Sequence, residues 1–204
     1  YIPETVQIPV SVKWDDANNQ DGKRLDSVEA ELYADGQATG NKVTLDEKNS
    51  WKASFAKVDV KKDGKRINYT VKTTENKDYT ITTTGNVLDD NGVVVTYKHV
   101  PETVNVSIKS AWNDANNQDG IRPATISVQL MKDDKEEGDN INLKIASSKT
   151  WSNLPKYANG KEIKYAVAIS DVSGYTKKVT GSVADGYVAA FTHSVYKTSV
   201  VVQN

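Results

Sequence analysis

The chain has 204 residues, with 27 acidic and 26 basic side chains and a formal net charge of −1 at neutral pH. This balance leaves no basic surface of the kind that nucleic-acid binding needs, and no apolar run reaches the roughly 18 residues of a membrane-spanning helix. Cysteine is absent. A disulfide scaffold, a thiolate metal site and a cysteine nucleophile are therefore excluded.

Taken in chain order, the segments between turns alternate Val, Ile and Tyr with polar residues, which predicts β-strands. The clearest are VQIPVSVKW at 6–14, SVEAELYADG at 27–36 and INYTVKT at 67–73. Turn sequences such as DANNQDG, DG and DNG separate them. No segment keeps a helical period over ten residues, and the charged run at 132–140 is predicted to be a loop or hairpin tip. Short strands at this spacing favour a β-sandwich.

The second half of the chain repeats the first. The stretch VKWDDANNQDGKR at 12–24 returns as SAWNDANNQDGIR at 110–122, and PETV occurs before both. A repeat of about 100 residues is a usual domain size. The domains are predicted at 1–100 and 101–198, with 199–204 as the start of a linker or of a further repeat. The connector HVPET contains a proline and no flexible Gly/Ser run, so it is expected to be stiff.

Both ends of the chain suggest a piece of a longer array. Tyr1 stands where His99 stands in the repeat, and YKTSVVVQN at the end is similar to the start of another unit. We therefore expect the chain to be cut from a longer tandem protein.

Together these motifs resemble a known family. The pattern W-[DN]-D-A-N-N-Q-D-G-x-R, the alternating strands, LPKYANGKEIKYAV, the GYT turn and the closing VTY strand are similar to the CnaB domain. This is the B-repeat of collagen-adhesin-type surface proteins of Gram-positive bacteria, and the resemblance covers nearly the whole of both repeats. It implies an all-β fold of two tandem inverse-immunoglobulin-like (prealbumin-like) β-sandwich domains, each of about seven strands. It also implies a cell-wall-anchored, extracellular stalk that projects a ligand-binding head.

The resemblance further implies where a covalent cross-link would form. Many members of the family join a Lys to an Asn by an isopeptide bond, with a buried Glu or Asp as the catalyst. The reaction needs a neutral amine, a protonated carboxyl and a dry site. In the family pattern the Lys lies two residues before the Trp, the acid two residues after the Val of YTV, and the Asn before the Thr-aromatic of the last strand. The corresponding positions here are Val12, Thr73 and Val95 in the first repeat, and Ser110, Ile169 and Phe191 in the second.

None of these six positions holds the residue type that the reaction needs. Loss of one member alone would leave a buried charge without its partner, whereas loss of all three leaves an ordinary packed core. We therefore predict no catalytic residue and no isopeptide bond in either repeat. The prediction depends on strand register. Lys13 and Lys109 flank the key position, and a bulge of one residue would turn Lys13 inward.

The repeated loop also has some features of a calcium site. Asp16, Asn18 and Gln20 have the 1, 3, 5 spacing of an EF-hand. However, Gly22 falls at position 7, and Ser27 at position 12 cannot act as the bidentate Glu. A hairpin or Asx-turn loop is favoured, and packing against a neighbouring module is a further alternative. No metal or cofactor site is predicted.

The histidines and tryptophans offer other candidates. His99 and His193 have no Ser and Asp spacing of a catalytic triad around them, so a structural or exposed role is expected. Trp14 and Trp112 are in phase with the inward face and are predicted core residues. Trp51 has no counterpart in the second repeat and is the one aromatic residue that we single out for surface binding.

Two functions of different classes remain. The first is a structural stalk, or spacer, whose domains lack the cross-link and extend under force. The second is an adhesive module that binds an extracellular matrix protein or a glycan directly, through loops or an exposed sheet face. The expected partners are the neighbouring repeats of the same chain and, through the parent protein, a host matrix protein or glycan. A monomer without nucleic-acid partner, membrane insertion or enzymatic activity is expected.

Overall fold

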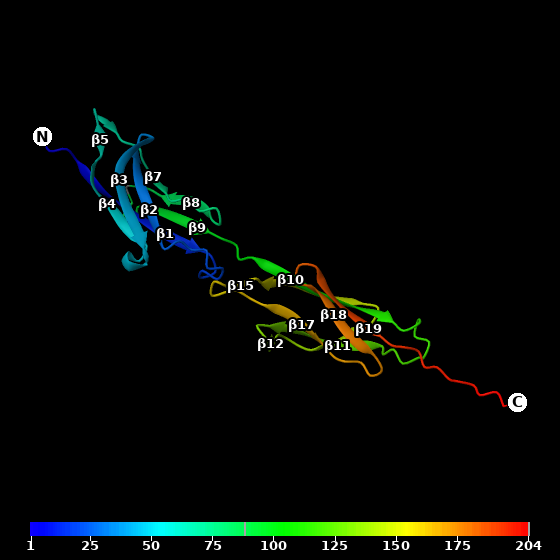
Figure 1. Cartoon of the computed structure of the whole chain (residues 1–204). Helices are drawn as coiled ribbons and strands as arrows, with labels where there is room; N and C mark the ends of the chain where they lie inside the picture. Colours follow the sequence, from blue (N-terminus) through cyan, green and yellow to red (C-terminus); the bar gives the residue numbers. More distant parts are fainter. Residues whose placement is uncertain (88, 204) are drawn as a thin grey trace. The chain divides into compact units, whose positions relative to one another are not determined.

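The computed structural model describes residues 1–87 and 89–203 of the chain. The chain divides into two compact units, Tyr1–Pro101 and Glu102–Asn204, so the boundary lies one residue after the expected position (Figure 1). Within the described residues the only helical element is the short 3₁₀ turn η1, Glu47–Asn49. No described helix has the length and hydropathy that a membrane span requires.

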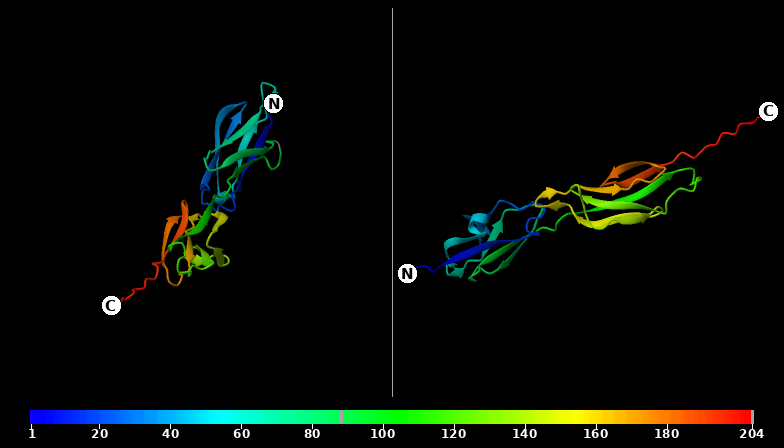
Figure 2. Two further views of the ribbon diagram at one scale, coloured as in Figure 1. Left: turned by 90° about the vertical axis from the view of Figure 1, so that its right-hand side faces the viewer. Right: turned by 90° about the horizontal axis from the view of Figure 1, so that it is seen from below.

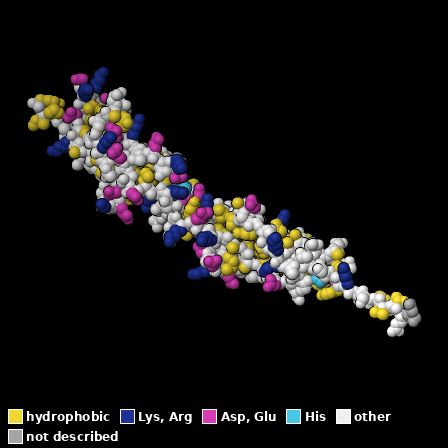
Figure 3. Space-filling view, in the orientation of Figure 1, with side chains coloured by type: hydrophobic (Ala, Val, Ile, Leu, Met, Phe, Trp, Pro, Cys, Tyr) yellow, Lys and Arg dark blue, Asp and Glu magenta, His cyan; other side chains and the backbone are white. Residues whose placement is uncertain are grey.

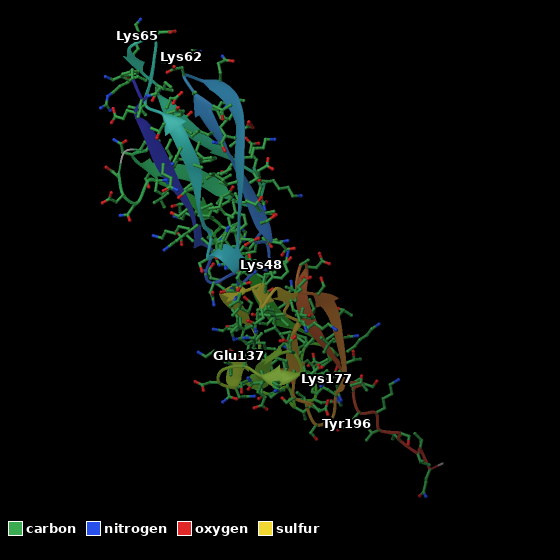
Figure 4. The ribbon with its side chains drawn as sticks, turned by 90° about the vertical axis from the view of Figure 1, so that its left-hand side faces the viewer. Lys48, Lys62, Lys65, Glu137, Lys177 and Tyr196 are labelled. Carbon is green, nitrogen blue, oxygen red and sulfur yellow. The ribbon has the colours of Figure 1, made fainter. Side chains whose placement is uncertain are left out.

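The first domain consists of two packed sheets. One sheet has the strand order β4-β1-β9-β8 and the other β3-β2-β7. The bounds are β1 Thr5–Asp15, β2 Ser27–Ala34, β3 Gln37–Asp46, β4 Lys52–Asp59, β7 Tyr69–Thr73, β8 Thr80–Gly85 and β9 Val93–Lys98. A small hairpin, β5 Lys61–Lys62 and β6 Lys65–Arg66, projects beyond them, with Lys62 and Lys65 at its tip (Figure 4).

Alternating side chains build the core between these sheets. On β1, Ile8, Val10 and Val12 are buried, while Lys13 between the inward positions is exposed. The facing sheet contributes residues such as Leu32 to the same cluster. Because side chains alternate between the two faces of a strand, the period-2 pattern of the sequence places one apolar face of each sheet in the core.

The second domain repeats this architecture. Its sheets have the order β14-β10-β19-β18 and β12-β11-β13, with β17 also paired to β11. The bounds are β10 Thr103–Asn113, β11 Thr125–Lys132, β12 Lys135–Glu136, β13 Ile141–Lys144, β14 Ser148–Pro155, β15 Tyr157–Ala158, β16 Lys161–Glu162, β17 Tyr165–Ile169, β18 Thr176–Ser182 and β19 Gly186–Thr192. The segment after β19 extends away from this domain (Figure 2). The predicted all-β fold of two tandem sandwiches is confirmed.

In each domain the first and last strands lie side by side at the centre of one sheet. β1 pairs with β9 in parallel, from Val10 opposite Val93 to Asp15 opposite Lys98. β10 and β19 pair in parallel in the same way. The chain therefore enters and leaves each domain through two neighbouring strands, which point in the same direction.

Candidate functional site

Two of the three positions of the expected cross-link lie side by side in the first domain. Val12 on β1 lies directly opposite Val95 on β9, and both side chains are buried. Thr73, on the facing sheet, is half-buried and hydrogen-bonds the hydroxyl of Tyr97. That hydroxyl also donates to the carbonyl oxygen of Thr74 at 2.5 Å. Two buried valines thus stand at the expected positions on the first and last strands, and Thr73 lies at the Tyr97 hydroxyl.

In the second domain the corresponding space holds a hydroxyl group with two partners. Ser110 Oγ accepts a hydrogen bond from Trp112 Nε1 at 2.9 Å and donates one to the carbonyl oxygen of Ile145 at 3.0 Å. Ile169 is buried in the same apolar cluster. Opposite Ser110 on β19 lies Ala189.

This pairing corrects the assignment of Phe191. Phe191 lies opposite Trp112, on which it stacks with ring centroids 4.5 Å apart, just as Tyr97 lies opposite Trp14. The structural equivalents are therefore Val95 with Ala189 and Tyr97 with Phe191. The sequence comparison aligned Thr96-Tyr97 with Thr192-His193. The loop before the last strand is shorter in the second domain, so this alignment is two residues out of register. Neither pair of positions contains an Asn.

The register of the first strand is as expected. Lys13 and Lys109 are both exposed, so neither lysine is turned into the core. The irregularity in β1 pairing lies earlier, between Val6 and Ile8. The alternative of an inward Lys13 is thus not found in the structure.

The repeated loop is built around a buried aspartate. Three consecutive residues, Ala17, Asn18 and Asn19, have φ values of 51°, 55° and 61°, a left-handed turn that Asn tolerates better than most side chains. Asp16 closes the turn by accepting the backbone N–H of Asn19 at 3.0 Å. Its carboxylate also receives Arg24 Nη2 at 2.6 Å and the hydroxyl of Tyr79 at 2.7 Å.

These donors determine the charge state of the aspartate. Burial raises the pKa of Asp16, but hydrogen bonds from Arg24, Tyr79 and the Asn19 amide outweigh it, so that the net pKa lies below the ordinary value. A guanidinium and a phenol thus occupy the oxygens that a calcium site would need. Within residues 1–87 and 89–203, no group of three or more His, Asp or Glu side chains has the arrangement of a metal site.

The second domain has the same cluster. Asp114 receives the guanidinium of Arg122, the hydroxyl of Tyr175 at 2.7 Å and the backbone N–H of Asn117 at 3.0 Å. The hydrogen bond from Arg122 is the main cause of a pKa of Asp114 far below its usual range. The repeated sequence therefore forms the same loop in both domains, and its Asp, Asn and Arg residues are joined by hydrogen bonds.

Both histidines are bonded at both ring nitrogens. His99 Nε2 lies 2.7 Å from Asp21 Oδ2, and its Nδ1 lies 2.7 Å from the carbonyl oxygen of Asp78. His193 makes the same contacts with Asp119 at 2.8 Å and with the carbonyl oxygen of Gly174 at 2.7 Å. No sequence motif pairs these residues in advance, although an Asp in the loop and a His after the last strand recur together in both repeats.

Trp51 is held in the first domain's aromatic cluster. Its ring packs edge-on against Trp14 with centroids 5.1 Å apart, and its backbone has a left-handed φ of 59°. Trp51 is half-buried, so the free surface ring that we singled out is only partly exposed. Trp14 Nε1 has no hydrogen-bond partner among the described residues, unlike Trp112 Nε1, because Val12 replaces the serine.

Two tandem sandwiches that share this loop and aromatic core are repeat modules of the surface-adhesin type. The chain belongs to the family of the Cna protein B-type domain, whose model matches residues 8–98 and 106–192. This is a family of structural repeats rather than of enzymes.

Individual relatives agree with this assignment. The chain is 39% identical over 188 residues to a collagen adhesin of Staphylococcus aureus, covering 89% of this chain and 15% of that protein. The crystal structure of two B repeat units of the collagen binding protein of Staphylococcus aureus is similar, with a TM-score of 0.69 and 34% identity. That match covers 95% of this chain and 51% of the other. The chain thus corresponds to a small part of a much longer relative.

Proposed function

We propose that the two domains are stalk repeats of a cell-wall-anchored protein on the surface of a Gram-positive bacterium. The repeats would hold a ligand-binding head away from the cell. The similar Staphylococcus protein is a collagen adhesin, which supports a host matrix protein as the ligand of that head. On the face of the molecule seen in Figure 3, acidic and basic side chains are interspersed, as suits a solvated spacer.

We further propose that neither domain contains an isopeptide bond. The observation that carries this proposal is the hydrocarbon pair Val12 and Val95, which lie opposite each other on the first and last strands with both side chains buried in the core. In the second domain Ser110 and Ala189 take the same places, and the serine hydroxyl is already satisfied by two hydrogen bonds. Neither pair of residues supplies the primary amine or the amide that an isopeptide bond needs.

The strand order explains how such a domain would carry force. Tension on the stalk would pull β1 and β9 along their length in opposite directions. Because the two strands pair in parallel from Val10 to Asp15, their hydrogen bonds would be loaded together in shear. Without a covalent bond this ladder would yield above a threshold force, and the domain would extend and then refold.

The intact mass of the folded chain tests the absence of the bond. We expect the measured mass to equal the mass calculated from the sequence. A deficit of one ammonia for each domain, or of one water for a Lys–Asp bond, would show that a cross-link forms. Fragmentation of the bonded peptides would then identify which lysine takes part.

A cavity in the first domain favours a second function, direct adhesion to a carbohydrate. The cavity has a volume of about 330 Å³ beside Trp51. Its lining is Asn18, Asn19, Arg24, Leu25, Asp26, Glu47 and Trp51. The indole offers an apolar face, and the carboxylates and amides offer hydrogen bonds to hydroxyl groups. Arg24 is neutralised by Asp16, so the remaining carboxylates favour a neutral sugar over an anionic one.

The second domain provides a natural control for this candidate. By strand register, Ala124 and Ile145 stand where Asp26 and Glu47 stand in the first domain. Binding to an array of neutral glycans that is lost in the double variant Asp26→Ala, Glu47→Ala would support adhesion. If no glycan on the array binds, the result would contradict direct adhesion and favour the stalk function.

A further inference from the structure

Each domain ends in a histidine that joins three separate segments. In the first domain, His99 follows β9 and contacts Asp21 in the loop after β1 and the Asp78 carbonyl in the turn before β8. Its backbone N–H also donates to the carbonyl oxygen of Asp15 at 2.9 Å, which extends the β1–β9 ladder by one bond. The side chain of His99 is 10% exposed and that of Asp21 is 1% exposed, so these contacts lie largely out of water.

The chemistry of the two acceptors fixes the protonation of the ring. A backbone carbonyl oxygen only accepts hydrogen bonds, so His99 Nδ1 carries a proton toward Asp78. An ionised carboxylate also only accepts, so Nε2 carries a proton toward Asp21. A neutral imidazole has one N–H and could satisfy only one of these oxygens. Only the imidazolium ion can donate to both oxygens at once.

We propose that His99 and His193 are imidazolium ions at neutral pH and act as proton-operated latches on the last strand of each domain. When the ring loses a proton, one nitrogen lone pair faces an acceptor oxygen, and the contact becomes repulsive. The latch then opens, and the end of the last strand is held by backbone bonds alone.

The groups around each ring favour the charged form. The charges that act on His99 are those of Asp21 and Asp78, and the Tyr79 ring packs with its centroid 5.5 Å away. Burial lowers the pKa of His99, but the hydrogen bonds to Asp21 and to the Asp78 backbone outweigh it, so that its pKa is raised.

The second latch has similar surroundings. Asp119 and Asp114 are the charges that act on His193, and the rings of Tyr175 and Tyr196 pack on it at 5.3 and 5.1 Å. The hydrogen bond to Asp119 is the main cause of the raised pKa of His193.

The second latch also holds the chain beyond the domain's last strand. Asp119 Oδ2 accepts the backbone N–H of Tyr196 at 2.9 Å in addition to the His193 ring. Tyr196 therefore stays against the loop although its side chain is largely exposed. Figure 4 shows this residue at the start of the extended segment. Tension arriving from the following chain would reach this latch before it reaches the β10–β19 ladder.

The direction of the pH effect follows from the raised pKa values. A histidine whose pKa is higher in the folded state stabilises the fold fully below its unfolded pKa, near 6.5, and this stabilisation is lost as the pH rises through the folded pKa. Thermal stability and unfolding force should both decrease on the alkaline side. The force prediction depends on the proposed stalk function, whereas the protonation state does not.

Nitrogen-15 NMR of the two imidazole rings in the wild-type chain tests the protonation state without any variant. We expect the pattern of a doubly protonated ring at pH 7, and titration midpoints above 6.5 for both residues. In the variant Asp21→Asn the midpoint of His99 should fall by about one pH unit or more, because an opposite charge at this distance is removed. The midpoint of His193 should stay unchanged and serves as the internal control. A neutral ring at pH 7 in the wild-type chain would overturn the proposal.

Single-molecule pulling at neutral and alkaline pH tests the latch itself. We expect the unfolding force of both domains to fall at alkaline pH. In the variant His99→Gln only the second domain should keep this dependence. Imidazolium rings combined with forces independent of pH would overturn the latch while leaving the stalk function intact. Domains that do not unfold at all under force would instead contradict the stalk proposal.

Discussion

At the residue scale, the two repeats differ most informatively at Val12 and Ser110. Both occupy the same place on the first strand, two residues before a core tryptophan. The serine satisfies the indole N–H of Trp112 and a backbone carbonyl, whereas the valine leaves Trp14 Nε1 without a hydrogen-bond partner among residues 1–87 and 89–203. The same position in the two cores is therefore filled by an apolar side chain in one domain and a polar side chain in the other.

Because the Ser110 hydroxyl makes two hydrogen bonds, we expect substitution of this residue to destabilise the second domain. The variant Ser110→Ala removes the hydroxyl and leaves both the Trp112 N–H and the Ile145 carbonyl without their partner. Each domain's free energy of unfolding can be followed by denaturation with amide hydrogen exchange. We expect the second domain to lose about 1 kcal/mol, the lower end of the cost of leaving a polar group unsatisfied, because these groups are partly buried. The same change at exposed Ser199 is the control, and an equally small effect at both positions would contradict the role of Ser110.

The buried aspartates predict a loss of stability in acid. The pKa values of Asp16 and Asp114 are lowered in the folded state. Their contribution is therefore present above the unfolded value, near 3.9, and is lost as the pH falls through the folded pKa. Melting temperatures measured from pH 7 to pH 2 should decrease in this range. The variant Asp114→Asn should be less stable at pH 7 and should show a smaller further loss in acid in the second domain. An unchanged acid dependence would contradict the role of this carboxylate.

The sequence predicted single positions well where alternation decides them. Trp14 and Trp112 were predicted to face the core, and each packs against the apolar core of its domain. The partners of the histidines were not predicted. Asp21 and His99 are 78 positions apart. Only the fold brings a loop near the start of the domain to the end of its last strand.

At the element scale, the strands were predicted, but the register of the last one was not. Pairing across a sheet depends on the length of the loop before the strand, which local alternation does not encode. Phe191 was therefore assigned to the wrong partner, although β19 itself was expected. The neighbours of Ser110 and Trp112 on that strand became clear only from the ladder.

The loop before the last strand supplies a prediction at this scale. Gly92 has a φ of 61°, and a Cβ there would lie 2.0 Å from the carbonyl oxygen of Pro9. At the equivalent Gly186, with a φ of 82°, a Cβ would lie 2.7 Å from Ser107 Oγ, which belongs to a movable side chain. Both substitutions to Ala impose a left-handed conformation that costs roughly 1–2 kcal/mol. Only the first also requires the backbone to move.

We therefore expect Gly92→Ala to destabilise the first domain clearly more than Gly186→Ala destabilises the second. Chemical denaturation followed by domain-resolved hydrogen exchange measures both losses in the same chain. Each variant has the unaltered domain as its internal reference. Equal losses would show that the contact with Pro9 does not restrain the loop.

At the scale of the whole molecule, the chain consists of two copies of one sandwich with different core details. Length, alternation and the repeated loop were sufficient to predict the number of domains and their fold. The motif residues that resemble the family were also sufficient to identify it. The physical reason is that each copy has its own core and its own pair of central terminal strands.

We propose that these domains carry force without a covalent bond between their first and last strands. Single-molecule pulling on the ends of the chain at neutral pH tests it most directly. We expect two unfolding steps, each lengthening the chain by roughly 300 Å, since an extended chain spans about 3.3–3.6 Å per residue, and refolding when the force is released. A chain that reaches high force without either step would contradict the claim, because only a bond between β1 and β9, and between β10 and β19, would prevent the extension.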